Sequence, residues 1–188
     1  MNRPDVLPIG KAFKMVAYLR GLNRLRDAAM VACTAGFGLR ISDVLALTWE
    51  DLLDGDRVRE IVTIREQKTR KQRSLMVLPV VAEAISAWYA ACRPVDPHAR
   101  VFPITREHAY RIVRDTAKAL GFHGRITPHS LRKAFCDHVY NLTRDPVMTA
   151  RITGHSNPAQ LLRYIGRLPE TEMTVWRRFA ESLERSKI

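Results

Sequence analysis

The spacing of the hydrophobic residues constrains the fold most, because it is helical along almost the whole chain and changes in one place. Helical spacing predicts helices over 10–20, 23–35, 42–52, 80–91, 106–120, 128–142 and 146–153, and over an amphipathic stretch at about 169–186. Two runs rich in strand-forming residues, 59–64 and 73–79, interrupt this pattern and are joined by the basic segment REQKTRKQR. The sequence therefore predicts an α+β fold class, mainly α with one small antiparallel β-sheet.

Length and charge narrow the class of protein. A chain of 188 residues is long enough for one domain with a real core, which we expect to span 10–188 after a short N-terminal arm, 1–9. No apolar run approaches the length of a membrane span and the N-terminus lacks an apolar signal segment, so we expect a soluble, cytoplasmic protein. The three isolated cysteines have the spacing of neither a disulfide framework nor a metal site. A formal net charge of +12, spread along the chain, indicates a polyanionic partner, usually nucleic acid.

Four segments place polar or basic residues where a hydrophobic core does not need them. In TAGFGLRISD, Arg40 follows a glycine-flanked turn and Asp43 lies three residues later; a solvated arginine, or one paired with Asp43, is the simple alternative. In PHSLRKAF, His129 and Arg132 share one face at a helix start, where the helix dipole favours a phosphate. Both patterns are common, so neither segment indicates a function alone.

The other two segments are the hairpin tip and the stretch GHSNPAQLLRYIG. Lys68 in the tip could donate a proton from a flexible ammonium, but for this lysine alone contact with a phosphate backbone or protection of a strand edge is the favoured explanation. In the later stretch, Asn157 and Pro158 predict a cap and a helix start, and Tyr164 follows His155 by nine residues. Packing is the alternative role for Tyr164, because apolar residues surround it on that helix.

Taken together, two arginines, a lysine, two histidines and a late tyrosine have a coherent chemical meaning. A tyrosine hydroxyl that attacks a phosphodiester creates a pentacoordinate state with extra negative charge, which arginine forks and a histidine can stabilise. The phenol, with an ordinary pKa of about 10, needs a base or a cationic pocket, and the departing 5′-oxygen needs an acid such as lysine. This chemistry needs no metal, and none of the segments has the spacing of metal ligands.

The order of these motifs over about 10–166 carries a family resemblance. TAGFGLRISD, a K-T-x-K hairpin, HSLRKAF, TGHSNP and a tyrosine nine residues after the histidine resemble the catalytic domain of the tyrosine recombinases, the phage integrase family. The resemblance implies the catalytic-domain fold of that family. It also implies site-specific recombination (integration, excision or inversion), in which DNA is cut and rejoined through a 3′-phosphotyrosine link without metal, ATP or cofactor.

The resemblance gives each site residue a role. Arg40 and Arg132 correspond to the two phosphate-clamping arginines, and Tyr164 to the nucleophile. His129 corresponds to the histidine that hydrogen-bonds the phosphate and assists proton transfer, and His155 to the second histidine, a donor to the phosphate.

The hairpin and the flanking basic residues complete this assignment. Lys68 corresponds to the general acid, with Lys71 as the alternative one register later, and Asp43 to an acidic residue that orients the site. Further contacts with DNA are expected from four basic residues: Arg70, Lys71, Arg73 and Lys133. The chain departs from the family pattern at Thr153, where leucine usually precedes Gly-His.

The family's assembly sets further expectations. The resemblance implies double-stranded DNA as partner, a homotetramer on paired sites, a monomer or weak oligomer without DNA, and a nucleoid-associated location in the cytoplasm. The C-terminal helix is a candidate for docking on a neighbouring protomer, with packing on its own domain as the alternative. Because only about nine residues precede the first predicted helix, we expect the family's N-terminal core-binding domain to be absent, as in an excised fragment or a short member.

Two other functions use similar features. A type IB topoisomerase forms the same phosphotyrosine link but religates the original strand; no long insertion separates His155 from Tyr164, which favours the recombinase. A DNA-binding regulator without chemistry would share the charge but has no need for the tyrosine.

Overall fold

The computed structural model describes residues 7–67, 70–167 and 172–185, so the expected general acid, Lys68, lies outside the described residues. The described elements are, in chain order, α1 (Ile9–Gly21), α2 (Leu25–Phe37), α3 (Ile41–Val44), α4 (Trp49–Leu52), β1 (Leu53–Asp54), β2 (Arg57–Val58), β3 (Ile61–Arg65), β4 (Gln72–Met76), α5 (Pro79–Cys92), α6 (Arg106–Ala119), α7 (Pro128–Thr143), α8 (Pro146–Thr153), α9 (Pro158–Tyr164) and α10 (Glu172–Arg185).

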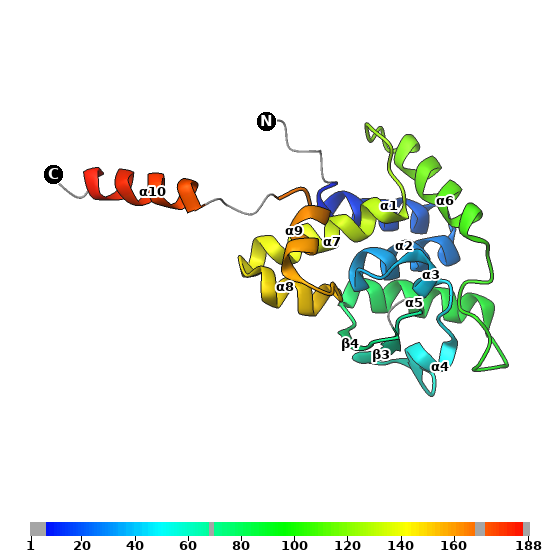
Figure 1. Cartoon of the computed structure of the whole chain (residues 1–188). Helices are drawn as coiled ribbons and strands as arrows, with labels where there is room; N and C mark the ends of the chain where they lie inside the picture. The colour runs from blue at the N-terminus through cyan, green and yellow to red at the C-terminus, as the bar shows by residue number, and fades with distance from the viewer. Residues whose placement is uncertain (1–6, 68–69, 168–171, 186–188) are drawn as a thin grey trace.

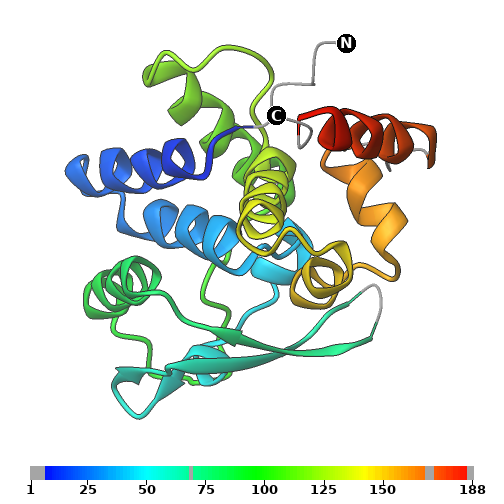
Figure 2. The ribbon, with the colours of Figure 1, turned by 90° about the vertical axis from the view of Figure 1, so that its left-hand side faces the viewer.

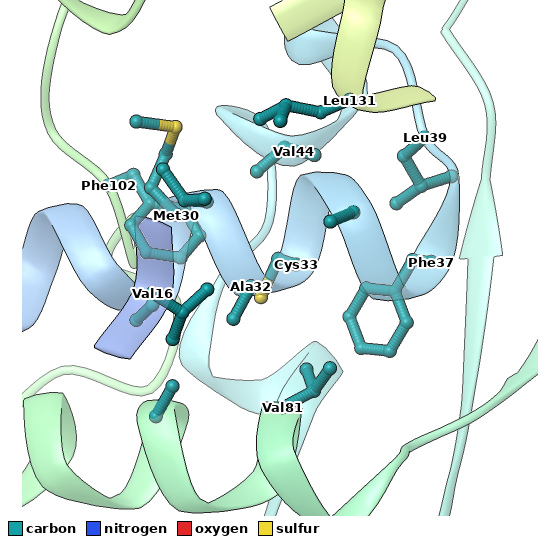
Figure 3. Packing of buried hydrophobic residues seen from close by; sticks show 14 of the residues in the cluster. Val16, Met30, Ala32, Cys33, Phe37, Leu39, Val44, Val81, Phe102 and Leu131 are labelled. Atoms are coloured by element: carbon teal, nitrogen blue, oxygen red, sulfur yellow. The ribbon is translucent and has the colours of Figure 1, made fainter. Parts of the chain in front are cut away.

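Helix α2 forms the centre of the fold. Every residue from 28 to 37 is buried, as its apolar pattern on all sides requires. Helices α1, α5 and α7 pack around it (Figures 1 and 2). Figure 3 shows Val16, Val81 and Leu131, one from each of these helices, among the buried side chains next to α2. The core therefore fixes the end of α2 relative to α7, and both elements lead into the candidate site.

Gly38 ends α2 and brings the following turn against α7. It has a left-handed backbone, with φ of 58°, which glycine adopts without strain. A Cβ at Gly38 would lie 2.1 Å from Cδ1 of Phe135, which belongs to α7. The glycine thus permits both the turn and the close approach, and Arg40 emerges two residues later beside α7.

The strands form two small sheets rather than the single sheet that was expected. Strands β1 and β2 pair separately from β3 and β4, and both pairs are antiparallel. In the longer hairpin, Val62 faces Leu75 and Ile64 faces Arg73 across the ladder, with all four side chains buried. The observed strand ends at Met76 instead of 79 because Pro79 occupies the first turn of α5. The hairpin itself and the mainly helical α+β class are confirmed.

The continuous helix predicted over 42–52 is wrong. Helices α3 and α4 are separate single turns, because Thr48 begins a new helix in a capping box with Asp51, whose Oδ2 accepts from the Thr48 backbone N–H at 2.8 Å. Thr48 also forms an isolated antiparallel bridge with Arg100. This long-range pairing supports a break that helical spacing cannot reveal.

The helix starts predicted after residue 127 are confirmed. Thr127 begins α7 in a capping box, the Asp145 side chain accepts from two backbone N–H groups of α8, and Asn157 accepts from the Gln160 N–H of α9. A proline occupies the first turn of each of the three helices. Helices with firm starts therefore carry His129 in α7 and Tyr164 in α9, and His155 lies in the turn between α8 and α9.

Helix α10 is amphipathic and extends beyond α9 (Figure 1). Three of its large apolar side chains, Val175, Trp176 and Phe179, are more than half exposed. Among the helices within the described ranges, none is both long and apolar enough to cross a bilayer.

We expect Gly38→Ala to lower the free energy of unfolding by about 2 kcal/mol or more, because a Cβ there adds left-handed strain and meets the Phe135 ring. Gly10→Ala is the matched control, since a Cβ at Gly10 meets nothing within 4 Å. That control should be neutral or stabilising by about 0.5–1 kcal/mol. Urea unfolding measures both variants, and equal stabilities would contradict the role given to Gly38.

Candidate active site

Five of the residues singled out from the sequence meet at one place. The Tyr164 ring lies edge-on to the His129 ring, with centroids 4.8 Å apart, and is tilted against the His155 ring at 5.1 Å. The Tyr164 hydroxyl lies 3.5 Å from Nδ1 of His129 and donates to its backbone carbonyl at 3.4 Å. Arg132 and Arg40 are both close enough to lower the pKa of Tyr164 against the effect of burial. Residues 124 positions apart in sequence thus form one cluster.

Arg132 joins the ends of two helices. Its guanidinium is buried and donates from Nη1 to the Gly38 carbonyl at 2.7 Å and from Nη2 to the Thr153 carbonyl at 3.2 Å. Gly38 terminates α2, and Thr153 is the last residue of α8. The C-terminal carbonyls of a helix lack partners within the helix, so an arginine is a good partner for them. These two contacts fix the plane of the guanidinium beside Tyr164.

Arg40 is held by a buried carboxylate that sequence reasoning missed. Its Nη1 lies 2.8 Å from Oε2 of Glu66, which is fully buried, and 3.8 Å from Oδ2 of Asp43. Asp43 is buried too, and its Oδ1 accepts from the Gln67 backbone N–H at 3.0 Å. Asp43 therefore ties the base of the hairpin to the Arg40 turn, whereas Glu66 makes the shorter contact with Arg40.

The sequence contains a signal that the Glu66 side chain is buried. Residues 62 and 64 of β3 point to the core, so the two-residue period of a strand places residue 66 on the same inner face. Glu66 is also the acidic residue within the basic segment REQKTRKQR. A carboxylate on an inner face needs a cationic partner, and Arg40 and Arg73 are both present.

Arg73 differs from the expectation of a DNA contact. It lies on the inner face opposite Ile64, is 8% exposed, and its Nη1 is 2.8 Å from Oε1 of Glu66. It also donates to the Ile152 carbonyl near the end of α8. Burial lowers the pKa of the Arg73 guanidinium, and the Glu66 carboxylate opposes that effect. Arg73 thus connects the hairpin to α8, because the strand register, rather than the local charge, determines which arginines are exposed.

The remaining basic residues fall in different environments. Arg70 and Lys71 are exposed on the hairpin, where they were expected, and Lys133 is half-buried in α7. Within residues 7–67, 70–167 and 172–185, no three metal-ligating side chains are grouped so that they could hold an ion.

Burial and the neighbouring arginines keep the two histidines of the cluster uncharged, and burial keeps the tyrosine uncharged. Burial, followed by the charges of Arg132 and Arg40, lowers the pKa of His155 to about 4. Burial and the nearby Arg132 and Lys133 also lower the pKa of His129. Burial raises the pKa of Tyr164, although Arg132 and Arg40 oppose the rise. At neutral pH the cluster thus presents arginine charges, two neutral imidazoles and a protonated phenol, an arrangement that an anion would stabilise.

We expect Glu66→Gln to lower the free energy of unfolding by about 3–5 kcal/mol, because Arg73 then lacks a buried counter-charge. Replacing Arg73 as well, in Glu66→Gln/Arg73→Met, should recover part of that loss by removing the unpaired cation. Glu60→Gln, on the exposed residue just before β3, is the control and should leave stability within about 0.5 kcal/mol of the parent. Urea unfolding measures all three, and a double variant less stable than Glu66→Gln would refute this account.

Comparisons with known proteins place this arrangement in a family. The model of the Phage integrase family matches residues 11–170. The probable integrase/recombinase YoeC of Bacillus subtilis (strain 168) is 32% identical over 169 residues, which cover 86% of this chain and 88% of that protein. The tyrosine recombinase XerC of Rhodospirillum centenum is 31% identical over 147 residues, covering 74% of this chain and 42% of XerC. For XerD of Corynebacterium glutamicum the identity is 27%, over 81% of this chain and 52% of XerD. The chain thus spans about half the length of these Xer relatives.

Solved structures share the fold. The XerA recombinase superposes with a TM-score of 0.72 at 20% identity, over 97% of this chain and 64% of XerA. The XerH recombinase, in a pre-cleavage complex with its difH substrate, gives a TM-score of 0.74 at 16% identity, over 95% of this chain and 54% of XerH. The tyrosine recombinase catalytic-domain fold expected from the sequence is confirmed. With most of its length matched by the family model, this chain belongs to the phage integrase family.

Proposed function

We propose that this chain is the catalytic domain of a site-specific DNA recombinase that uses Tyr164 as its nucleophile. The observation that carries the proposal is the position of the Tyr164 hydroxyl, within 3.5 Å of His129 and beside Arg132, in a chain of this family. The neighbours of Tyr164 are the groups that a phosphoryl transfer to an oxygen nucleophile requires. Packing alone would not demand two histidines and two arginines around one phenol.

The chemistry follows from these groups. The Tyr164 oxygen attacks phosphorus while its proton passes to Nδ1 of His129, 3.5 Å away. A P–O bond forms to tyrosine and the bond to the 5′-oxygen breaks, leaving a 3′-phosphotyrosine and a 5′-hydroxyl. Arg40 and Arg132 stabilise the non-bridging oxygens, so the charge is met without a metal. The 5′-oxygen takes a proton from Lys68, with Lys71 as the alternative. Attack by the partner strand's 5′-hydroxyl reverses these steps and needs no ATP, because the ester retains the bond energy.

The nucleophile acts within its own protomer. The Tyr164 ring contacts His129 and His155 of the same chain, and the short helix α9 that carries it starts at a firm Asn157 cap. Cleavage in cis therefore needs no movement of α9 to a neighbouring protomer.

Double-stranded DNA is the proposed partner. A net charge of +12 and the exposed Arg70 and Lys71 on the hairpin favour a polyanion. XerH is bound to its difH substrate, and a lambda integrase dimer is bound to a core site. We further propose a homotetramer on paired sites, in which the exposed apolar face of α10 docks on a neighbouring protomer.

We expect covalent capture to identify the nucleophile. Suicide duplexes with randomised arms, nicked near the scissile phosphate, should give a protein–DNA adduct with the parent protein and none with Tyr164→Phe. Tyr140→Phe is the matched control, because Tyr140 packs in the same small apolar cluster as Tyr164 but contacts Arg167 instead of the histidines. An undiminished adduct in Tyr164→Phe would refute the assignment. Captured sequences that support relaxation of supercoiled DNA but no exchange between molecules would instead indicate a topoisomerase.

The proposed role of Lys68 as general acid can be tested by changing the atom that leaves phosphorus. Lys68→Ala should cleave a normal duplex about 10²–10⁴-fold more slowly, because the 5′-oxygen departs without a proton. The same variant should regain most of the rate on a 5′-bridging phosphorothiolate, whose sulfur leaves without one. Single-turnover rates on both substrates check this, and equal defects would move the role to Lys71, for which Lys71→Ala is the parallel variant.

A further inference from the structure

The hydroxyl of Thr153 makes two hydrogen bonds that together determine which nitrogen of the neighbouring His155 ring carries a proton. Its hydroxyl is fully buried and donates to the Thr149 carbonyl at 2.8 Å. The same oxygen lies 2.7 Å from Nδ1 of His155. A hydroxyl has one proton, and a carbonyl can only accept. Because the Thr153 proton is used on Thr149, the second contact requires Nδ1 of His155 to be the donor.

The Nδ1–H of His155 decides what its other nitrogen can do. A neutral imidazole carries one N–H, so a ring protonated at Nδ1 has a bare lone pair at Nε2. His155 is neutral at pH 7, since burial and the arginines lower its pKa to about 4. A bare Nε2 can accept a proton but cannot donate to a phosphate oxygen.

We propose that Thr153 is a positioning residue that fixes His155 in the Nδ1–H form, so that His155 becomes a phosphate donor only by taking up a proton. Anion binding and proton uptake are thereby coupled at this ring. The part about the anion rests on the proposed function, whereas the assignment of the Nδ1–H form rests on the Thr153 geometry alone.

The charges around His155 set the direction of the coupling. Arg132 of α7, Arg40 before α3 and Arg73 of β4 disfavour a proton on the ring, and Glu66 favours one. The Tyr164 ring, which contacts the rings of both histidines, and the His129 ring are uncharged, and burial raises the pKa of the Cys136 thiol next to Thr153 to about 11. A phosphate adds negative charge and an acceptor, so it raises the pKa of His155, and its affinity should increase as the pH falls.

The first experiment is long-range ¹H–¹⁵N NMR of ¹⁵N-histidine-labelled protein without DNA. In the parent and in Thr153→Ser, which keeps the hydroxyl, His155 should carry its proton on Nδ1 at pH 7. Thr153→Val keeps the shape but loses the acceptor, so the proton should move largely to Nε2. Thr149→Val is the matched control, since Thr149 is equally buried but its hydroxyl bonds to Asp145 and Thr143, not to His155. A parent ring protonated on Nε2, or no change in Thr153→Val, overturns the proposal.

The second experiment adds sulfate, which keeps its charge between pH 5 and 9 and so cannot supply the proton. In the parent and in Thr153→Ser, saturating sulfate should raise the pKa of His155 by about 1–3 units, as followed by the same NMR signals. In Thr153→Val the rise should be at most half as large, because the neutral ring already donates from Nε2. An equal rise in both, or none in the parent, overturns the coupling. The covalent-capture assay with Tyr164→Phe is independent, so failure of the proposed function is distinguishable from failure of this inference.

Discussion

The buried carboxylate of Glu66 is the contact on which the arrangement of the site depends. It lies between Arg40 and Arg73 at 2.8 Å from each, and with Asp43 it balances the two positive charges. Removing such charges from water costs several kcal/mol per ion, so the group is stable only while every partner is present. Through Arg73 it holds the end of α8, and through Arg40 the turn after α2. Three segments distant in sequence are thus aligned by one side chain.

Arg132 also joins the end of α2 to the end of α8. Its donors go to the carbonyls of Gly38 and Thr153, which lie at the C-terminal ends of α2 and α8. The proposed catalytic groups therefore lie where two helices end and α7 begins, with His129 in the first turn of α7. Unpaired carbonyls at helix ends immobilise the arginine, and the N-terminus of α7 adds a partial positive charge near the phenol. Contacts with backbone carbonyls at helix ends thus organise this site.

The sequence predicted those parts of the structure that local chemistry determines. The starts of α7, α8 and α9 follow from a capping side chain and a proline next to it, and all three were found. The break at Thr48 and the burial of Arg73 were missed, because one depends partly on a bridge to Arg100 and the other on strand register and on Glu66. The cluster of arginines, histidines and tyrosine was inferred from the order of the motifs and the family that they resemble. Helix caps, strand periods and local charge alone would not have predicted that these residues meet.

Burial keeps the phenol of Tyr164 and the imidazole of His155 from taking the charges that the proposed chemistry needs. The pKa of Tyr164 is raised and that of His155 is about 4, so the phenol keeps its proton and the imidazole is neutral. Burial disfavours the charged forms of Tyr164 and His155. A bound phosphodiester would bring the negative charge that Arg40, Arg132 and a protonated His155 require. A bound phosphodiester would therefore complete the charge balance of the site. In our proposal, Thr153 holds the proton of His155 on Nδ1 and leaves Nε2 with a lone pair. His155 must therefore take up a second proton before it can donate a hydrogen bond to a phosphate.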